Sequence, residues 1–255
     1  MNTFLEGRKL MKEKVTAIVT WLRKQVALSH TKGLVVGVSG GLDSAVVAFL
    51  IKKAFPNQSI SVIMPIKSNP VDMAHAKQVN EACGIKEMTI DLTSIHEAMF
   101  SQICKELNED INDDNRRLAD ANLRARLRMS TLYTVATNYN YLVVGTDNKA
   151  EWYTGYFTKY GDGGVDLLPL IDLTKEEVRK MAEFLGVPKE VIEKEPSADL
   201  WEGQTDEIEM GTTYDMIDAY LNGHPIPIEH ENIIKTMHKR TEHKRNIPTP
   251  FYFTE

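Results

Sequence analysis

Cysteine is scarce in this sequence: Cys83 and Cys104 are the only two among 255 residues, and they form no C-x-x-C pair. Neither a disulfide framework nor a zinc site is therefore expected, and a reducing compartment fits best. Long apolar runs are missing as well, since the run at 45–51 is far shorter than the roughly 20 residues that span a membrane. The N-terminal residues also lack the apolar core of a signal peptide. We expect a cytoplasmic protein with no membrane partner.

An excess of positive charge is absent too. With 30 Lys and Arg against 36 Asp and Glu, the net charge is −6, whereas broad nucleic-acid binding needs a basic face. Nucleic acid is therefore not expected as a partner. Anionic ligands would need local positive partners, and two basic clusters qualify, at 116–128 and 238–245.

Hydrophobic periodicity predicts alternating helices and strands. Apolar residues spaced by three and four between Met11 and Val26 indicate an amphipathic helix over about 8–28. Further helices are predicted at about 44–55, 69–83, 93–107, 117–138, 174–186, 213–222 and 228–242, and strands at 34–38, 59–64, 86–90 and 141–145. β-branched strands alternating with helices are typical of a parallel sheet covered on both faces. We expect a single α/β domain over 1–255 with a doubly wound parallel sheet.

Two polar stretches show no clear period. Residues 108–117 predict a flexible connection, and 193–211, with one proline and two glycines, predicts a loop. Such a long loop favours a functional role, so we expect a mobile lid at about 195–210 that becomes ordered with nucleotide. C-terminal helices and a tail then occupy 213–255.

The segment 37–44, GVSGGLDS, follows a β-branched strand and opens a helix. It lacks the lysine of a P-loop, and its glycines have the wrong spacing for G-x-G-x-x-G, which leaves S-G-G-x-D-S. Backbone N–H groups at a helix start favour anions, so Asp43 would repel phosphate unless a cation lies between them. Mg²⁺, which prefers carboxylate and phosphate oxygens, resolves that conflict. The alternative is an ordinary glycine turn with an aspartate cap.

The S-G-G-x-D-S segment resembles the pyrophosphate-binding loop of the PP-loop ATP pyrophosphatases. The segments 145–179 (GTDNKAEWYTGYFTKYGDGGVDLLPLIDLTKEEVR), 194–200 (KEPSADL) and 241–245 (TEHKR) closely resemble the ammonia-dependent NAD synthetase family within that superfamily. Several separate motifs occur in the family's order along nearly the whole chain. The resemblance implies an adenine nucleotide alpha hydrolase-like, Rossmann-like fold.

The resemblance also implies a reaction, the last step of NAD biosynthesis. The nicotinate carboxylate of deamido-NAD attacks the α-phosphate of ATP, and an acyl-adenylate and pyrophosphate form. Ammonia then displaces AMP to give the carboxamide. The substrate supplies the nucleophile, so the protein must supply positioning and neutralisation of phosphate charge.

Site residues carried over from the family fall into three groups. The resemblance assigns ATP binding to Gly37, Val38, Ser39, Gly40, Gly41, Leu42, Asp43, Ser44, Thr146, Lys175 and Ser197. It assigns Mg²⁺ to Asp43 and Glu151, and deamido-NAD to Arg126, Lys159, Asp166, His243 and Lys244. Catalytic roles would belong to Asp43, Lys175, Ser197 and Asp162. Ser197 stands where other members have threonine, and the hydroxyl is kept.

Partners and rival functions follow from the same comparison. The synthetase match uses almost the whole chain, which leaves no room for a fused glutaminase, so we expect free ammonia as the nitrogen source. The family implies a homodimer, and the apolar side chains of the helix at 117–138 suggest where it forms. Rivals are a GMP synthetase, a tRNA-modifying PP-loop enzyme and a nucleotide-binding sensor. The acidic charge, the lack of paired cysteines and the joint presence of Glu151 and Lys175 argue against them.

Overall fold

The computed structural model describes residues 2–107, 112–195, 205–251 and 253, with side chains from residue 6 onward. Four parallel strands form one sheet in the order β3-β2-β1-β4. The strands are β1 (Gly33–Gly37), β2 (Ser59–Ile63), β3 (Lys86–Thr89) and β4 (Tyr141–Val143). The β-branched run at Val35 and Val36 makes β1 a central strand, and both side chains are fully buried.

Helices cover both faces of the sheet, because successive side chains of a strand point to opposite sides. Leu34 and Val36 pack into one hydrophobic cluster, whereas Val35 packs into another. The first cluster collects α1 (Asn2–Leu28), α2 (Leu42–Ala54), α3 (Pro70–Cys83), α7 (Lys175–Leu185) and α8 (Lys189–Ile192). The second faces α5 (Asp113–Tyr139), and α4 (Thr93–Glu106) packs against α5. The doubly wound α/β fold is thus confirmed.

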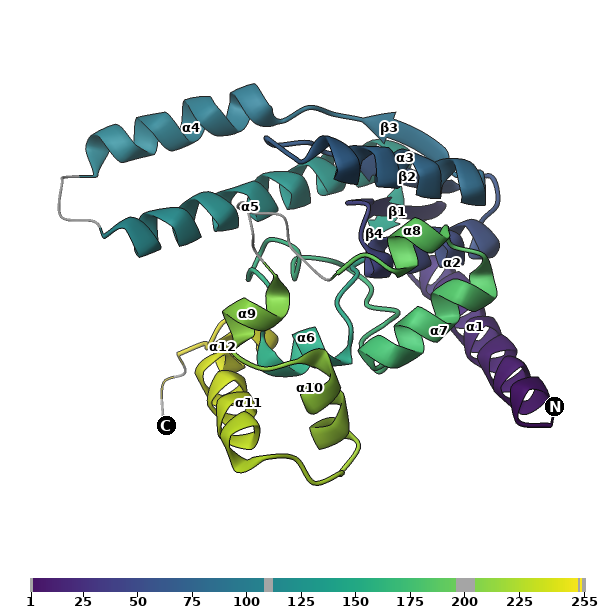
Figure 1. Ribbon diagram of the computed structural model, residues 1–255. Coiled ribbons are helices and arrows are strands. Elements are labelled where there is room, and N and C mark those ends of the chain that lie inside the picture. The colour runs from purple at the N-terminus through teal and green to yellow at the C-terminus, as the bar shows by residue number, and fades with distance from the viewer. Residues whose placement is uncertain (1, 108–111, 196–204, 252, 254–255) are drawn as a thin grey trace.

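A third hydrophobic cluster lies beyond the sheet, around the fully buried Ile217 and Ile234. Figure 1 shows the helices of this cluster gathered below the carboxyl ends of the strands. They are α6 (Lys149–Thr154), α9 (Asp206–Met210), α10 (Tyr214–Leu221) and α11 (Ile228–Arg240), followed by α12 (Glu242–Arg245). This cluster brings C-terminal residues to the edge where parallel sheets bind ligands.

Two predictions of irregular structure were wrong in part. Helix α5 begins at Asp113, inside the expected flexible connection, because the Asn112 side chain accepts the N–H of Asn115 and starts the helix. Helix α9 occupies part of the expected lid, between the Thr205 cap and the left-handed Gly211. Helix α6 follows β4, where no helix was predicted. The remainder of the lid, 196–204, lies outside the described residues.

Among the described residues, none of the helices is both long enough and apolar enough to pass through a membrane.

Candidate active site

The glycine-rich segment 37–44 leaves the carboxyl end of β1 and enters α2, as expected. Its two serine hydroxyls fix the turn from within. Ser44 Oγ accepts the N–H of Ser39 at 3.2 Å and donates to the carbonyl of Gly41 at 3.0 Å. Ser39 Oγ in turn accepts the N–H of Gly41 at 3.2 Å. The loop is therefore shaped before any ligand arrives, which lowers the entropic cost of binding.

Gly40 is required by the packing of this loop against α3. Its φ of +85° lies in the left-handed region, and a Cβ there would lie 2.3 Å from the carbonyl oxygen of Asp72. Any larger residue would push the loop away from α3.

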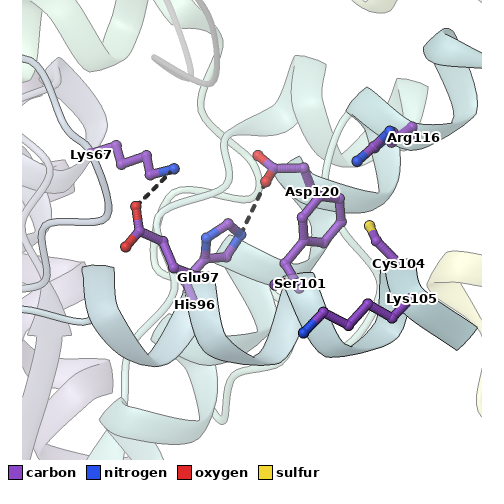
Figure 2. Close-up of a pocket in the computed structure, with 9 residues that line it drawn as sticks. Lys67, His96, Glu97, Ser101, Cys104, Lys105, Arg116 and Asp120 are labelled. Carbon is purple, nitrogen blue, oxygen red and sulfur yellow. Dashed lines mark ion pairs between the residues drawn. The ribbon is translucent and has the colours of Figure 1, made fainter.

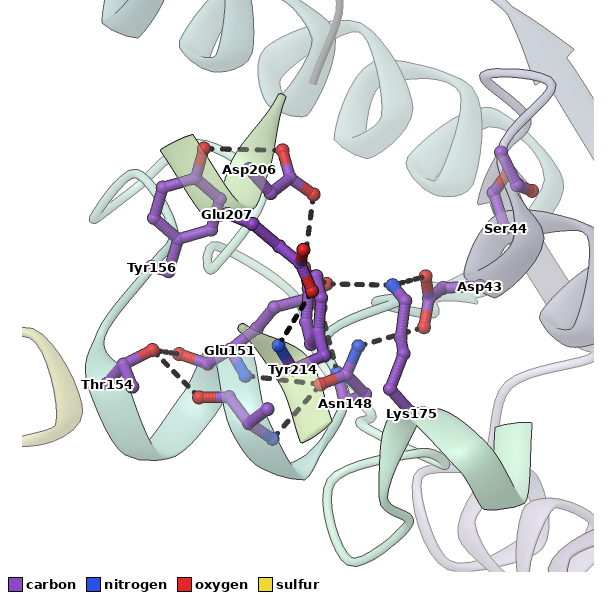
Figure 3. Close-up of polar contacts among 12 residues, drawn as sticks. Asp43, Ser44, Asn148, Glu151, Thr154, Tyr156, Lys175, Asp206, Glu207 and Tyr214 are labelled. Atoms are coloured by element: carbon purple, nitrogen blue, oxygen red, sulfur yellow. Dashed lines mark hydrogen bonds and ion pairs between the residues drawn. The ribbon is translucent and has the colours of Figure 1, made fainter. Parts of the chain in front are cut away.

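Lys175 joins two carboxylates that come from different parts of the chain. Its Nζ lies 2.6 Å from Asp43 Oδ2 and 3.3 Å from Glu151 Oε1. Figure 3 shows the three side chains converging from α2, α6 and α7. All three are nearly buried, with 5% of the Lys175 side chain exposed and 15% and 13% of its two partners. The structure thus brings together the predicted metal ligands and a predicted phosphate-binding lysine.

Capping interactions place these residues. The spacing of Thr174 and Glu177 in the sequence predicts a capping box. The structure forms it, which makes Lys175 the first residue of α7. Asn148 and Glu151 form a second box at the start of α6, and the amide Nδ2 of Asn148 donates to Asp43 at 3.0 Å. The spacing of Asn148 and Glu151 in the sequence was a signal for this second box that the sequence analysis missed.

Burial and charge set the protonation of the cluster. Burial raises the pKa of Glu151 to about 7, although Lys175 acts in the opposite direction. Burial would lower the pKa of Lys175, but Asp43 and Glu151 outweigh it and raise that pKa. Burial also raises the pKa of Asp206, whose charge contributes to the environment of Lys175. Because one lysine serves several acids, the cluster favours an additional cation.

The hydroxyl contacts of two tyrosines in this network were not predicted. The Tyr214 hydroxyl lies 2.8 Å from Glu151 Oε1 and 3.0 Å from Asp206 Oδ2. Tyr156 continues the network, because its hydroxyl donates to Asp206 at 3.3 Å and to Glu209 at 2.7 Å. Tyr214 lies 63 residues from Glu151 in the chain, and no local motif links them.

A cavity of about 420 Å³ opens in front of this cluster. Most residues predicted to bind ATP or metal line it, together with Asp162 and Lys244. The lining predicted residues are Gly37, Val38, Ser39, Gly41, Leu42, Asp43, Ser44, Thr146, Glu151, Asp162, Lys175 and Lys244. Gly40, within the loop, faces α3 instead, and Ser197 is outside the described residues.

The residues predicted to bind the dinucleotide are only partly brought together. Arg126 Nε donates to the carbonyl of Lys159 at 3.3 Å, and Lys159 Nζ donates to the carbonyl of His243. Lys244 Nζ follows, donating to the carbonyl of Phe157 at 2.6 Å. Asp166 is apart from this chain of contacts. Its carboxylate accepts the N–H of Val143 at 2.8 Å and the Tyr133 hydroxyl at 2.9 Å, which anchors β4.

Asp162 and Asp147 form a second acidic pair at the cavity. Asp162 Oδ1 accepts the N–H of Thr158 at 3.0 Å, and burial raises its pKa. Burial and the neighbouring charge of Asp162 raise the pKa of Asp147 well above the usual value. Lys244 is the basic residue that acts on both groups. Asp147 was not predicted as a site residue.

The donor set fits a magnesium ion that is completed by phosphate. Asp43 and Glu151 approach the same cationic position, now taken by Lys175 Nζ. Among the residues that the structure describes, no group of three or more His, Cys, Asp or Glu side chains could hold a metal without help. Mg²⁺ usually binds through one or two carboxylates plus substrate phosphates, which matches two acids beside the glycine-rich loop.

A second cavity, of about 500 Å³, lies between α4 and α5. Figure 2 shows the buried His96 facing Asp120, with Nε2 3.2 Å from Oδ1, and Lys67 paired with Glu97 at 3.0 Å. Burial lowers the pKa of His96, so the ring is neutral at pH 7. None of the predicted site residues lines this cavity, and the glycine-rich loop does not reach it.

Comparison with known proteins places this geometry in a family. The model of the family described as NAD synthase matches residues 14–248. A relative from Alkaliphilus metalliredigens, named NH(3)-dependent NAD(+) synthetase, is 58% identical over 237 residues, which cover 92% of this chain and 96% of the relative.

Solved structures agree with the fold. The structure of NMN synthetase from Francisella tularensis superposes with a TM-score of 0.89 at 38% identity, covering 95% of this chain and 99% of that one. The structure of NH3-dependent NAD synthetase from Campylobacter jejuni superposes with a TM-score of 0.76 at 27% identity, covering 95% and 99%.

Proposed function

The chain belongs to the NAD synthase family, and we propose that it converts deamido-NAD to NAD with ATP and ammonia. AMP and pyrophosphate are the other products. The observation that carries this proposal is the convergence of Asp43, Glu151 and Lys175 on the cavity that the glycine-rich loop also lines. This arrangement suits an enzyme that binds a nucleoside triphosphate and neutralises the negative charge that grows when its α-phosphate is attacked.

The first step needs no nucleophile from the protein. An oxygen of the nicotinate carboxylate attacks the α-phosphorus, and the bond to pyrophosphate breaks. Backbone N–H groups of 37–44 hold the phosphates, and the ammonium group of Lys175 neutralises charge that grows in the transition state. Ser197, in the KEPSADL motif, would add a hydroxyl to the phosphates.

Asp43 and Glu151 would hold Mg²⁺ next to those phosphates. When bound, the ion offsets the repulsion between carboxylates and phosphate and makes pyrophosphate a better leaving group. The carboxylates are held ready for this by Asn148 and by Lys175.

In the second step, the nitrogen of ammonia attacks the acyl carbon, and the bond to the AMP oxygen breaks. Asp162, which lines the cavity, would take a proton from the incoming nitrogen. Arg126, Lys159, His243 and Lys244 would hold the dinucleotide, because the arginine and the two lysines supply positive charge for its phosphates and Lys244 lines the cavity. Asp166 would support the same edge through β4.

A second candidate substrate is nicotinate mononucleotide. The similar structure from Francisella tularensis carries the name NMN synthetase, and its superposition covers nearly all of both chains. Both substrates present the same nicotinate carboxylate, so the chemistry at Asp43 and Lys175 would be unchanged. They differ only in whether an adenylate half is present.

One product assay separates these reactions. Purified protein receives ATP, Mg²⁺ and ammonium with either deamido-NAD or nicotinate mononucleotide, and glutamine replaces ammonium in parallel tubes. We expect NAD and AMP in equal amounts with deamido-NAD and ammonium only. Faster turnover of the mononucleotide would favour the second candidate, turnover with glutamine alone would contradict ammonia dependence, and no AMP in any tube would reject both.

We also propose that the enzyme is a homodimer whose interface includes α4. Three apolar side chains of α4 and the residue that caps its end are spaced by four residues and form one stripe. They are Ile95, Met99, Ile103 and Leu107, each exposed by 39–52%. The expected interface on α5 is less free, because Leu132 and Val135 are already buried against the sheet. A second copy would cover the stripe symmetrically.

We place the reaction in the cytoplasm. Cys83 and Cys104 are both free thiols, which suits a reducing compartment.

A further inference from the structure

Tyr214 connects the C-terminal helices to the centre of the site. The residue is only 3% exposed and comes from α10, which belongs to the third hydrophobic cluster. Its hydroxyl contacts Glu151 at 2.8 Å and Asp206 at 3.0 Å, and its ring centroid lies 4.5 Å from Lys175 Nζ. Figure 3 shows Tyr214 between the α6 and α9 carboxylates.

These contacts fix both oxygens of the Glu151 carboxylate. Oε2 accepts the N–H of Asn148 at 3.1 Å, within the capping box. Oε1 accepts the Tyr214 hydroxyl and faces Lys175. The box holds Glu151 only to its own short helix, whereas Tyr214 holds it from a different part of the fold. Tyr214 of α10, together with Lys175 of α7, therefore sets the orientation of Oε1.

The Tyr214 ring acts on Lys175 at the same time. A lysine ammonium above an aromatic face is attracted to it, and the attraction grows when both are removed from water. One buried tyrosine thus contacts two of the charged residues that converge on the loop.

We propose that Tyr214 is a positioning residue for Glu151 and Lys175, which sets the carboxylate for the metal and supports the phosphate-binding lysine. This inference rests on the proposed function, because it takes Glu151 as a ligand of Mg²⁺. Tyr214 itself does not line the cavity.

Tyr156 provides a matched control. Its hydroxyl also donates to two acids, the exposed Glu209 at 2.7 Å and the buried Asp206 at 3.3 Å. Tyr156 meets Glu151 only through the backbone, where its N–H donates to the Glu151 carbonyl at 2.9 Å. Tyr214→Phe and Tyr156→Phe each remove one hydroxyl, keep the ring and leave Asp206 with one tyrosine partner. A difference between them at the metal site therefore reports the contact with Glu151.

The test measures binding of Mn²⁺, used in place of Mg²⁺, by electron paramagnetic resonance with a non-hydrolysable ATP analogue present. We expect about tenfold weaker Mn²⁺ binding in Tyr214→Phe, the size of one hydrogen bond to a charged group, and less than a twofold change in Tyr156→Phe. In turnover assays, Tyr214→Phe should raise the KM for Mg²⁺·ATP and leave the KM for ammonium unchanged. Equal Mn²⁺ affinity in Tyr214→Phe and the unmodified protein, or equal loss in both variants, would overturn the proposal.

Two further measurements keep the proposal testable. If Tyr214→Phe does not fold, the unmodified protein is used for the test. Adding Mg²⁺ should then change its tyrosine absorbance, and Tyr156→Phe should show the same change. Mg²⁺ binding without any tyrosine perturbation would then contradict the role of Tyr214. Mn²⁺ binding does not require amide formation, so a protein that amidates neither nicotinate substrate yet shows the Mn²⁺ difference would refute only the proposed function.

Discussion

Lys175 is almost completely buried, and a buried charge is tolerated only when it is paired. Its partners, Asp43 and Glu151, carry more negative charge than one lysine can balance. The residue therefore serves two purposes. It compensates the two acids, and under the proposed function it would also provide positive charge at the phosphate position.

Replacing Lys175 by methionine tests this dual role. Loss of the ammonium leaves two buried acids without compensation, so we expect a loss of about 3 kcal/mol in stability and roughly a hundredfold loss of kcat. Mg²⁺ should restore part of the stability, because the ion can take the place of the lysine charge. Thermal unfolding with and without Mg²⁺ measures this.

Lys180→Met is the matched control on the same helix. Lys180 pairs with Glu176 at 2.6 Å, but both side chains are more than half exposed, and such a pair contributes at most about 1 kcal/mol. The stability of Lys180→Met should therefore differ little from that of the unmodified protein and should not respond to Mg²⁺. A Lys175→Met protein as stable as Lys180→Met would contradict the account.

At the scale of elements, helix starts organise the site. The helices α2, α6 and α7 each begin at the cavity, and Asp43, Glu151 and Lys175 lie in their first turns. Two of these helices start with capping boxes, which fix the first turn more tightly than hydrophobic packing alone. The residues at which these three helices begin therefore set the positions of the three charged side chains.

Gly40→Ala tests how closely the loop must pack against α3. The left-handed conformation costs an alanine about 1–2 kcal/mol, and the added Cβ also collides with the Asp72 carbonyl. We expect the loop to shift and the KM for ATP to rise at least tenfold. Steady-state kinetics and thermal unfolding measure both effects.

Gly84→Ala separates the collision from the backbone strain. Gly84 also has a left-handed φ, at the end of α3, but a Cβ there meets nothing within 4 Å. That variant should lose stability without any change in the KM for ATP. An unchanged KM in Gly40→Ala would show that the loop can bind ATP away from α3.

On the scale of the whole molecule, α4 and α5 lie side by side and project beyond the sheet. The pair leaves the apolar stripe of α4 uncovered, although an apolar row of this kind is costly in water. The same α5 lines the active-site cavity through Ala121, Asn122 and Ala125. A partner on this pair would therefore lie near the site.

A double substitution, Met99→Glu with Ile103→Glu, tests the homodimer. Two carboxylates in an apolar interface cannot be hydrated there, so we expect a dimer for the unmodified protein and a monomer for the variant at micromolar concentration. Light scattering coupled to size-exclusion chromatography measures the mass. Leu10→Glu, at an apolar residue of α1 that is 54% exposed, should remain dimeric. A dimeric double variant would exclude α4 from the interface.

The sequence by itself determined the four strands, the longer helices, the glycine-rich loop and the Thr174 capping box. These features depend on residues close together in the chain, so their physics is local. The family resemblance, which rests on several separate motifs, also identified Glu151 and Lys175 as partners of the loop.

Only the tertiary structure decided how those residues are held. The contact of Tyr214 with Glu151 joins α10 to α6, and the contact of Lys175 with Asp43 spans 132 residues. The burial of Leu132 and Val135 likewise depends on how α5 packs on the sheet. Such contacts arise when elements that are distant in the chain pack together, and no local pattern of residues encodes that packing. The packing decides which acids need a cation and which apolar stripe needs a partner.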